Sequence, residues 1–113
     1  MKGQVIKMAE QPYGFVAFWK SSDTWYAADE KERQRFLDEI KEIMDEAEAK
    51  GIHSHGTFSC SWSSEWKYFT FWTCPAIELL QEVTDKLERI GDINKYNIQH
   101  HYVGRKVEGE CLV

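Results

Sequence analysis

YGFVAFWK, residues 13–20, is the stretch that decides the fold. It has the composition of a β-strand, and successive side chains of a strand point to opposite faces. One face would carry Tyr13, Phe15, Ala17 and Trp19, and the other would carry Gly14, Val16, Phe18 and Lys20. Because both faces are largely apolar, we expect the chain's own helices to cover one and a second copy of the protein to cover the other.

The composition narrows the function classes. At 113 residues the chain is long enough for one domain, and the net charge of −5 without a basic run argues against nucleic acid and anionic membranes as partners. Residues 1–11 lack the apolar core of a signal peptide, and no apolar run is long enough to span a membrane. Three cysteines, Cys60, Cys74 and Cys111, favour reduced thiols. We therefore expect a cytoplasmic protein.

The order of elements predicts the fold class. After the first strand, helical periodicity covers residues 28–50, strands follow at 52–62 and 66–73, a second helix runs from Pro75 to Gly91, and a last strand lies within residues 96–106. This β-α-β-β-α-β order predicts a ferredoxin-like α+β domain over residues 12–106. Its sheet would have strand order 4-1-3-2 with both helices on one face. Residues 1–11 are expected to form an N-terminal arm or a short extra strand, and 107–113 a C-terminal tail.

The pattern from residue 13 to 105 resembles the dimeric α+β barrel superfamily, and within it an uncharacterised family of small proteins. The residues that carry this resemblance are Trp19, Trp25, Glu32, Arg33, Phe36, Gly51, Tyr68, Phe69, Phe71, Trp72, Pro75, Tyr96 and Gly104. The resemblance implies the fold and a homodimer. It does not select an activity, because members of that superfamily include cofactor-free monooxygenases, haem enzymes, isomerases and binding proteins.

A pocket is expected on the sheet face opposite the helices. The purely apolar set of Val16, Phe18, Phe58, Cys60, Phe69 and Phe71 is assigned to the helices. The other set mixes apolar surface with polar tips, as small-molecule sites do. The pocket residues predicted are Tyr13, Phe15, Trp19, Trp25, Tyr68, Trp72 and His100. The direction of the last strand stays open, because either His101 with Asn97 and Gln99, or His100 with Tyr102, would face the pocket.

Histidines are the candidate catalytic residues. His53 and His55, two apart on a strand, share one face, and His101 or His100 is a third candidate. Two imidazoles can ligate a metal, but the second and fourth strands are expected at opposite edges of the sheet, so a metal site within one chain is not favoured. One axial histidine in an aromatic cavity would suffice for haem, which is also possible but not favoured. An imidazole can also act as a base.

The sequence therefore predicts a homodimer that binds a small aromatic or apolar ligand, with the ligand and any cofactor unknown. The first alternative is a cofactor-free monooxygenase or isomerase that acts on an aromatic substrate through a histidine base. The second alternative is a haem- or metal-binding protein.

Overall fold

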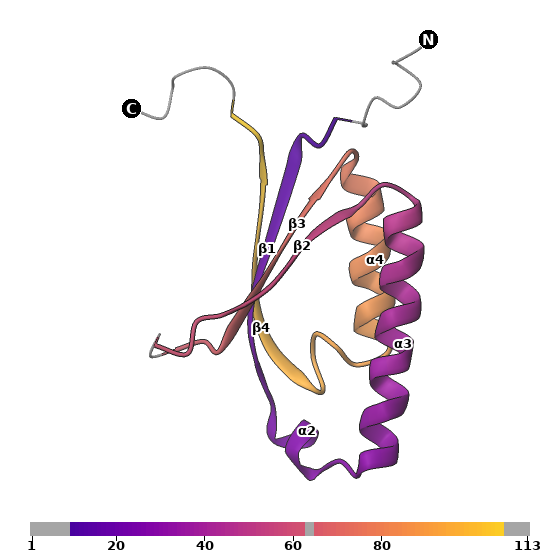
Figure 1. The fold of residues 1–113 in the computed structure, drawn as a ribbon, viewed down its shortest axis with the longest axis vertical. Coiled ribbons are helices and arrows are strands. Elements are labelled where there is room, and N and C mark those ends of the chain that lie inside the picture. Colours follow the sequence, from indigo (N-terminus) through magenta and orange to yellow (C-terminus); the bar gives the residue numbers. More distant parts are fainter. Residues whose placement is uncertain (1–9, 63–64, 108–113) are drawn as a thin grey trace.

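The computed structural model describes residues 10–62 and 65–107. Its elements follow the predicted order, with one short additional helix after the first strand (Figure 1). They are β1 (Tyr13–Ser21), α2 (Asp23–Ala27), α3 (Glu30–Ala49), β2 (His53–Ser59), β3 (Tyr68–Cys74), α4 (Ile77–Arg89) and β4 (Asn97–Arg105). The possible extra strand in the N-terminal arm, most of the tail and Cys111 lie outside the described residues.

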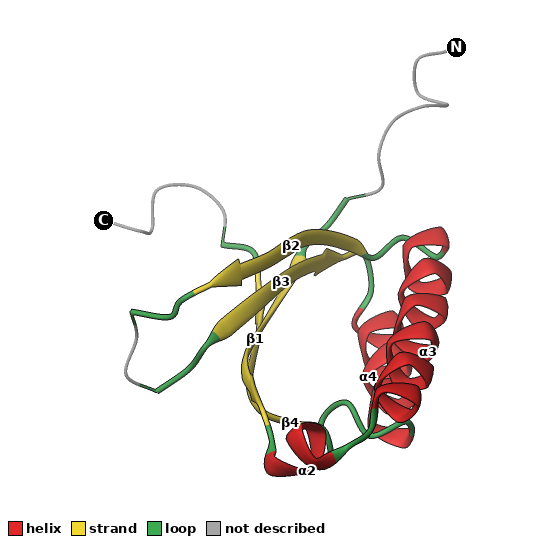
Figure 2. Cartoon of the chain, turned by 60° about the horizontal axis from the view of Figure 1, so that its bottom comes forward, coloured by secondary structure: helices red, strands yellow, loops and turns green. Residues whose placement is uncertain are grey.

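The four strands form one antiparallel sheet in the order β2-β3-β1-β4. This is the predicted order, and it confirms the ferredoxin-like α+β fold. Figure 2 shows the two long helices, α3 and α4, side by side across one face of a curved sheet, with α2 at one end. In the described part of the chain, no helix combines the length and apolarity that crossing a membrane requires.

Capping side chains set where the first two helices begin. Ser22 caps α2 by accepting a hydrogen bond from the Trp25 backbone N–H, 3.3 Å away. Asp29 caps α3 by accepting one from Glu32 N–H at 2.8 Å. Ala28 between them is extended, so the helix predicted over residues 28–50 begins at Glu30, and α2 is an additional helix that precedes it.

Glycines end both long helices in the same way. Gly51 and Gly91 have φ of 114° and 95°, and each follows the last helical residues in a Schellman motif. In the second motif Gly91 N–H donates to Glu88 C=O at 3.0 Å, and Asp92 N–H donates to Leu87 C=O at 2.9 Å. The chain therefore leaves α4 toward the sheet with Asp92 in a fixed place. At its other end α4 begins at Ile77 after Ala76, so the prediction that Pro75 is the first helical residue was wrong.

The assignment of the two sheet faces was also wrong. Phe15, Ala17 and Trp72 are buried in one cluster with Leu80 and Leu87 of α4, so their face is the one that the helices cover. The residues expected against the helices lie instead on the other face, which we call the outer face: Val16 and Phe18 on β1, Phe69 and Phe71 on β3, and Phe58 on β2. Both sets are large and apolar, and the packing of α4 against Phe15 and Trp72 decides between them.

A bulge in β2 breaks the predicted alternation. The pairing with β3 shifts between Ser54 and Thr57, where Gly56 has φ of 96°. Thr57 therefore shares the inner face with its partner Thr70, while His53 and His55 lie on the outer face, where the His55 ring is 4.9 Å from Phe71. An unbroken strand would have kept these histidines and Thr57 on one side.

Candidate ligand cavity

A cavity of about 520 Å³ lies between the inner face of the sheet and the helices. Its volume falls in the range of small-molecule sites. The lining residues come from nearly every element and from the segment after α4: Phe15, Ala17, Trp19, Ser21, Trp25, Phe36, Leu37, Ile40, Met44, Asp45, Glu48, Ile52, Ser54, Thr57, Tyr68, Thr70, Trp72, Thr84, Leu87, Asp92, Ile93, Asn97, Gln99 and His101.

The sheet side of the cavity is an aromatic wall. Phe15 stacks on Trp72 with ring centroids 5.0 Å apart, and Trp19 lies 4.7 Å from Tyr68. The Trp19 indole N–H donates to Thr70 Oγ1 at 3.0 Å, which fixes the orientation of the ring. These paired strands β1 and β3 therefore present flat apolar surface whose geometry is set before any ligand enters.

A second aromatic group closes the end of the cavity near α2. Trp25 and Phe36 pack edge to face at 5.7 Å, and Phe36 lies 4.5 Å from the Tyr96 ring. The Tyr96 hydroxyl donates to Glu32 Oε2 at 2.6 Å, and Arg33 donates to the backbone carbonyl of Trp25 at 3.0 Å. These bonds join α2, α3 and the start of β4, so Trp25 is held by the fold rather than by a free loop.

Polar side chains at the start of β4, at the same end of the sheet as α2, form one hydrogen-bond network. The Gln99 amide N–H₂ donates to the backbone carbonyl of Asp92 at 3.0 Å and to its Oδ2 at 3.1 Å. Asn97 Nδ2 donates to Asp92 Oδ1 at 2.9 Å. The Gln99 carbonyl oxygen then lies 2.6 Å from His101 Nε2 and accepts its hydrogen. In neutral His101 the proton is therefore on Nε2, and Nδ1 carries the free lone pair.

Burial shifts the acid–base behaviour of both ends of this network. Burial raises the pKa of Asp92, and the Gln99 and Asn97 donors act in the opposite direction. Burial also lowers the pKa of His101, helped by the neighbouring charge of His100. The neutral imidazole is thus the favoured form in the folded protein.

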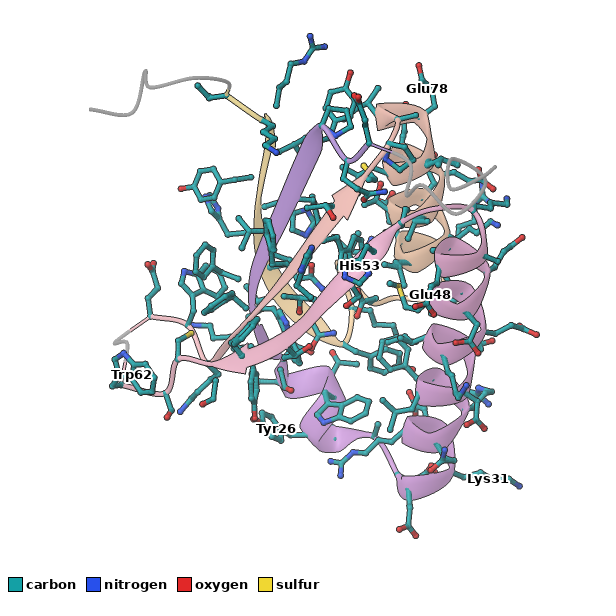
Figure 3. All side chains as sticks on the ribbon, turned by 45° about the horizontal axis from the view of Figure 1, so that its top comes forward. Tyr26, Lys31, Glu48, His53, Trp62 and Glu78 are labelled. Carbon is teal, nitrogen blue, oxygen red and sulfur yellow. The ribbon has the colours of Figure 1, made fainter. Side chains whose placement is uncertain are left out.

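The charged groups that line the cavity are all carboxylates. They are Asp45 and Glu48 of α3 and Asp92, and among the described lining residues there is no lysine or arginine. Asp45 is paired with Lys41 at 2.8 Å. In Figure 3 Glu48 lies on the side of α3 toward the sheet, whereas Lys31 points away from it. The cavity is therefore aromatic with an acidic character.

The structure brings together most, but not all, of the predicted site residues. Those that line the cavity are Phe15, Trp19, Trp25, Tyr68, Trp72 and His101. Tyr13 packs against the core and its hydroxyl accepts a hydrogen bond from Arg105 Nη2 at 3.0 Å, outside the lining. Pairing with β1 resolves the direction of β4, since His101 lies opposite Ala17 on the inner face and His100 lies opposite Phe18 on the outer face.

The hydrogen-bond network of Asp92, Asn97 and Gln99 in the cavity lining was not predicted from the sequence. The only indication for Asp92 is its position directly after Gly91, the residue that ends the helix. Asn97 and Gln99 had been placed with His101 by strand parity, but nothing in the sequence indicated that both would donate to Asp92.

The remaining histidines belong to a layer of aromatic side chains on the outer face. The His53 and His55 rings are 4.5 Å apart, and His100 lies 4.8 Å from Tyr102. Phenylalanines join the strands in this layer, which we call the outer aromatic layer: Phe18, Phe58, Phe69, Phe71, His53, His55, His100 and Tyr102. In the described ranges, no three His, Cys, Asp or Glu side chains are arranged to hold a metal ion.

The two described cysteines give no nucleophile to the cavity. Cys60 and Cys74 are both free and buried. Burial raises the pKa of the Cys74 thiol, which keeps it protonated, and the backbone near Ala76 only partly opposes this effect.

Comparison with solved structures identifies the fold class. Similar structures include a chlorite dismutase from Candidatus Nitrospira defluvii, with TM-score 0.70 and 14% identity over 87% of this chain and 41% of that one. A haem-binding protein from Thermus thermophilus has TM-score 0.72 and 11% identity over 89% and 42% of the two chains. This chain therefore spans less than half the length of those proteins. These likenesses show a shared fold, which in this chain is the ferredoxin-like α+β fold with strand order β2-β3-β1-β4.

The chain belongs to a protein family described as a family of unknown function (DUF6616), whose model matches residues 12–108. No match was found among curated proteins.

Proposed function

We propose that this protein binds a small aromatic ligand in the cavity between the sheet and the helices. The observation that carries the proposal is the aromatic wall: Trp19 is oriented by Thr70, and Phe15 is stacked on Trp72, around a volume of about 520 Å³. A preformed apolar site with a few fixed polar groups is the usual form of a small-molecule site. A core that served packing alone would fill this volume with side chains.

The test is to fill the cavity from the helix side. Ile40 of α3 lines the cavity and Gln34 of the same helix lies on its exposed outer surface, so Ile40→Trp and Gln34→Trp introduce the same ring on opposite sides. Binding of the neutral probe 2-naphthalenemethanol is followed by tryptophan fluorescence and by the unfolding midpoint.

We expect the probe to bind the unmodified protein and the Gln34→Trp variant, and to bind Ile40→Trp about tenfold or more weakly because the added ring takes its place. If Ile40→Trp binds the probe as tightly as the unmodified protein does, the binding site lies outside this cavity. Absence of binding to every variant would contradict the proposal.

Proton transfer by His101 is a second candidate function. The relay from Asp92 through Gln99 holds His101 Nε2 and leaves Nδ1 as the acceptor, and burial favours the neutral ring. A neutral imidazole of fixed tautomer at the edge of an aromatic cavity suits the removal of a proton from a bound aromatic substrate, as in a cofactor-free monooxygenase or isomerase. His53 and His55 are on the outer face, so we leave them out of this role.

Haem, the group named for one structural neighbour, does not fit the lining of this cavity. His101 is the lining histidine, and because its Nε2 donates to Gln99 at 2.6 Å, only Nδ1, the ring nitrogen beside the side chain's own Cβ, is left to ligate an iron. The haem propionates would meet Asp45, Glu48 and Asp92 and, among the described lining residues, no cation to pair with them. We therefore propose a ligand other than haem.

We also propose that two copies of the chain associate through the outer aromatic layer. Phe58 and Tyr102 in this layer are 46% and 59% exposed, and the layer crosses all four strands. A second copy would bring an equivalent aromatic surface, as a two-fold interface requires.

A further inference from the structure

We propose that the ligand of the cavity is an aromatic compound that carries a positively charged amine, with the ring against the aromatic wall and the ammonium group in a lining whose charged side chains are the carboxylates of Asp92, Glu48 and Asp45. This inference rests on the proposed binding function and adds the charge of the ligand. It follows from three features of the lining, namely one buried carboxylate, two carboxylates on α3, and rings whose faces have no cation.

Asp92 is a carboxylate that lacks a counter-ion. Its two oxygens accept hydrogen bonds from the neutral amides of Asn97 and Gln99, and no cation pairs with it among the described residues. A carboxylate has about four lone-pair positions, so the two oxygens retain acceptor capacity. Burial raises the pKa of Asp92, which reports that its charged form is poorly solvated. An ammonium group in the cavity would supply the missing charge.

The α3 side of the cavity adds negative charge. Glu48 lines the cavity and has no ion-pair partner in the described part of the chain, while Asp45 beside it is paired with Lys41. Two lysines between α3 and α4 pair with glutamates that do not line the cavity: Lys86 contacts Glu46 at 2.7 Å, and Lys50 contacts Glu82 at 2.6 Å. An anionic ligand would therefore meet repulsion.

The aromatic wall favours the same charge. Aromatic faces attract cations, and four rings in this protein have a cation over them, such as Tyr13 with Arg105 at 5.3 Å and, in the lining itself, Trp25 with Arg33 at 5.3 Å. Trp19, Tyr68 and Trp72 have no such cation among the described residues, although they line the cavity. A cation that contacts these three rings would therefore have to come from a ligand.

The experiment compares three probes that differ only in charge on one ring system. They are 2-naphthylmethylamine, 2-naphthalenemethanol and 2-naphthoate, titrated into the full chain at neutral pH and low salt. We expect the amine to bind about tenfold more tightly than the alcohol and the acid to bind most weakly, because one partly desolvated charge pair is sufficient for that difference. The preference for the amine should decrease in high salt.

Matched pairs of variants test which carboxylates are responsible for the preference for the amine. Asp45→Asn with Glu48→Gln removes two carboxylates from the lining, and Glu39→Gln with Glu42→Gln removes two from the outer surface of the same helix. The first pair should weaken amine binding by about two- to fivefold per charge and leave alcohol binding unchanged, because these carboxylates are exposed to solvent. The second pair should change neither. Asp92→Asn should have a larger effect on the amine than either pair.

The outcomes separate the two proposals. If the alcohol binds and the amine binds no better, the cavity is a ligand site and the inference about charge is wrong. The same conclusion follows if both carboxylate pairs weaken amine binding equally. If none of the three probes binds, the proposed binding function itself fails.

Discussion

At the scale of single residues, His101 is the histidine whose setting differs most from that of an exposed imidazole. It is held by Gln99 at 2.6 Å, packs 4.9 Å from Phe15 and has a lowered pKa because of burial. The unfolded chain therefore takes up this proton at a higher pH than the folded protein does. The contribution of His101 to stability is complete above the unfolded pKa of about 6.5 and is lost as pH falls below it.

We predict that His101→Phe reduces the loss of stability in acid. Between pH 7.5 and 5, the free energy of unfolding of the unmodified protein should decrease more than that of the variant, by up to about 1.4 kcal/mol per pH unit below the unfolded pKa. Urea unfolding at the two pH values measures the difference, and the other three histidines are the same in both proteins. Equal pH dependence would show that the ring is solvated, and it would remove the case for His101 as a neutral base.

The position of His101 in the cavity was only partly predictable from the sequence. Strand alternation placed His101 with Asn97 and Gln99, and His100 with Tyr102, but it gave no reason to prefer one set for the inner face. The register with β1, in which Ala17 lies opposite His101, makes that choice. Residue identity alone carries no information on which of two apolar faces the helices will cover.

At the scale of elements, the C-terminal ends of the two long helices were the most predictable features and the interior of β2 was the least. Gly51 and Gly91 have no side chain and end α3 and α4 where the apolar periodicity stops. The bulge at Gly56 was not predicted, because a glycine within a strand does not by itself indicate that the pairing register with the next strand shifts. That shift moved His53 and His55 away from the cavity.

Gly91 provides a test of how the end of α4 builds the site. A Cβ at this position, where φ is 95°, would lie 3.1 Å from Lys95 Cβ and 3.3 Å from the Tyr96 ring. We predict that Gly91→Ala lowers the free energy of unfolding by about 1–2 kcal/mol and weakens binding of an aromatic amine, because Asp92 is the next residue. Gly104→Ala is the control, since no atom lies within 4 Å of its Cβ.

Chemical unfolding and the probe titration measure both effects of Gly91→Ala. The control should stay within about 0.5 kcal/mol of the unmodified protein. A Gly91→Ala variant as stable as the control would mean that the αL turn after α4 is not required.

At the scale of the whole molecule, the fold class and strand order were predicted from the order of elements, whereas the roles of the two faces were exchanged. The argument that a purely apolar set belongs under the helices fails here, because the inner face also has to leave room for a cavity. Trp19 and Thr70 satisfy each other's polar groups within it. The purely apolar set is then left on the outer face, where it requires a partner surface.

This requirement gives the prediction for assembly. Phe69 lies at the centre of the outer aromatic layer, 5.0 Å from Phe58 and 5.7 Å from Phe18, so Phe69→Lys would place a charge in the proposed interface. Tyr26 on α2 is 66% exposed and lies outside the layer, which makes Tyr26→Lys a matched control. Sedimentation equilibrium at micromolar concentration should give two chains for the unmodified protein and for the control.

The Phe69→Lys variant should sediment as a monomer, because burying one unpaired charge at a central aromatic contact costs about 2 kcal/mol or more, or about 30-fold in the dissociation constant. It should keep the far-ultraviolet circular dichroism of the unmodified protein, since the outer face contributes little to the cluster beneath the helices. If the unmodified protein is itself a monomer, the proposal that two copies associate through the outer aromatic layer is wrong. We also expect the monomeric Phe69→Lys variant to bind the naphthalene probes, because every described lining residue comes from one chain.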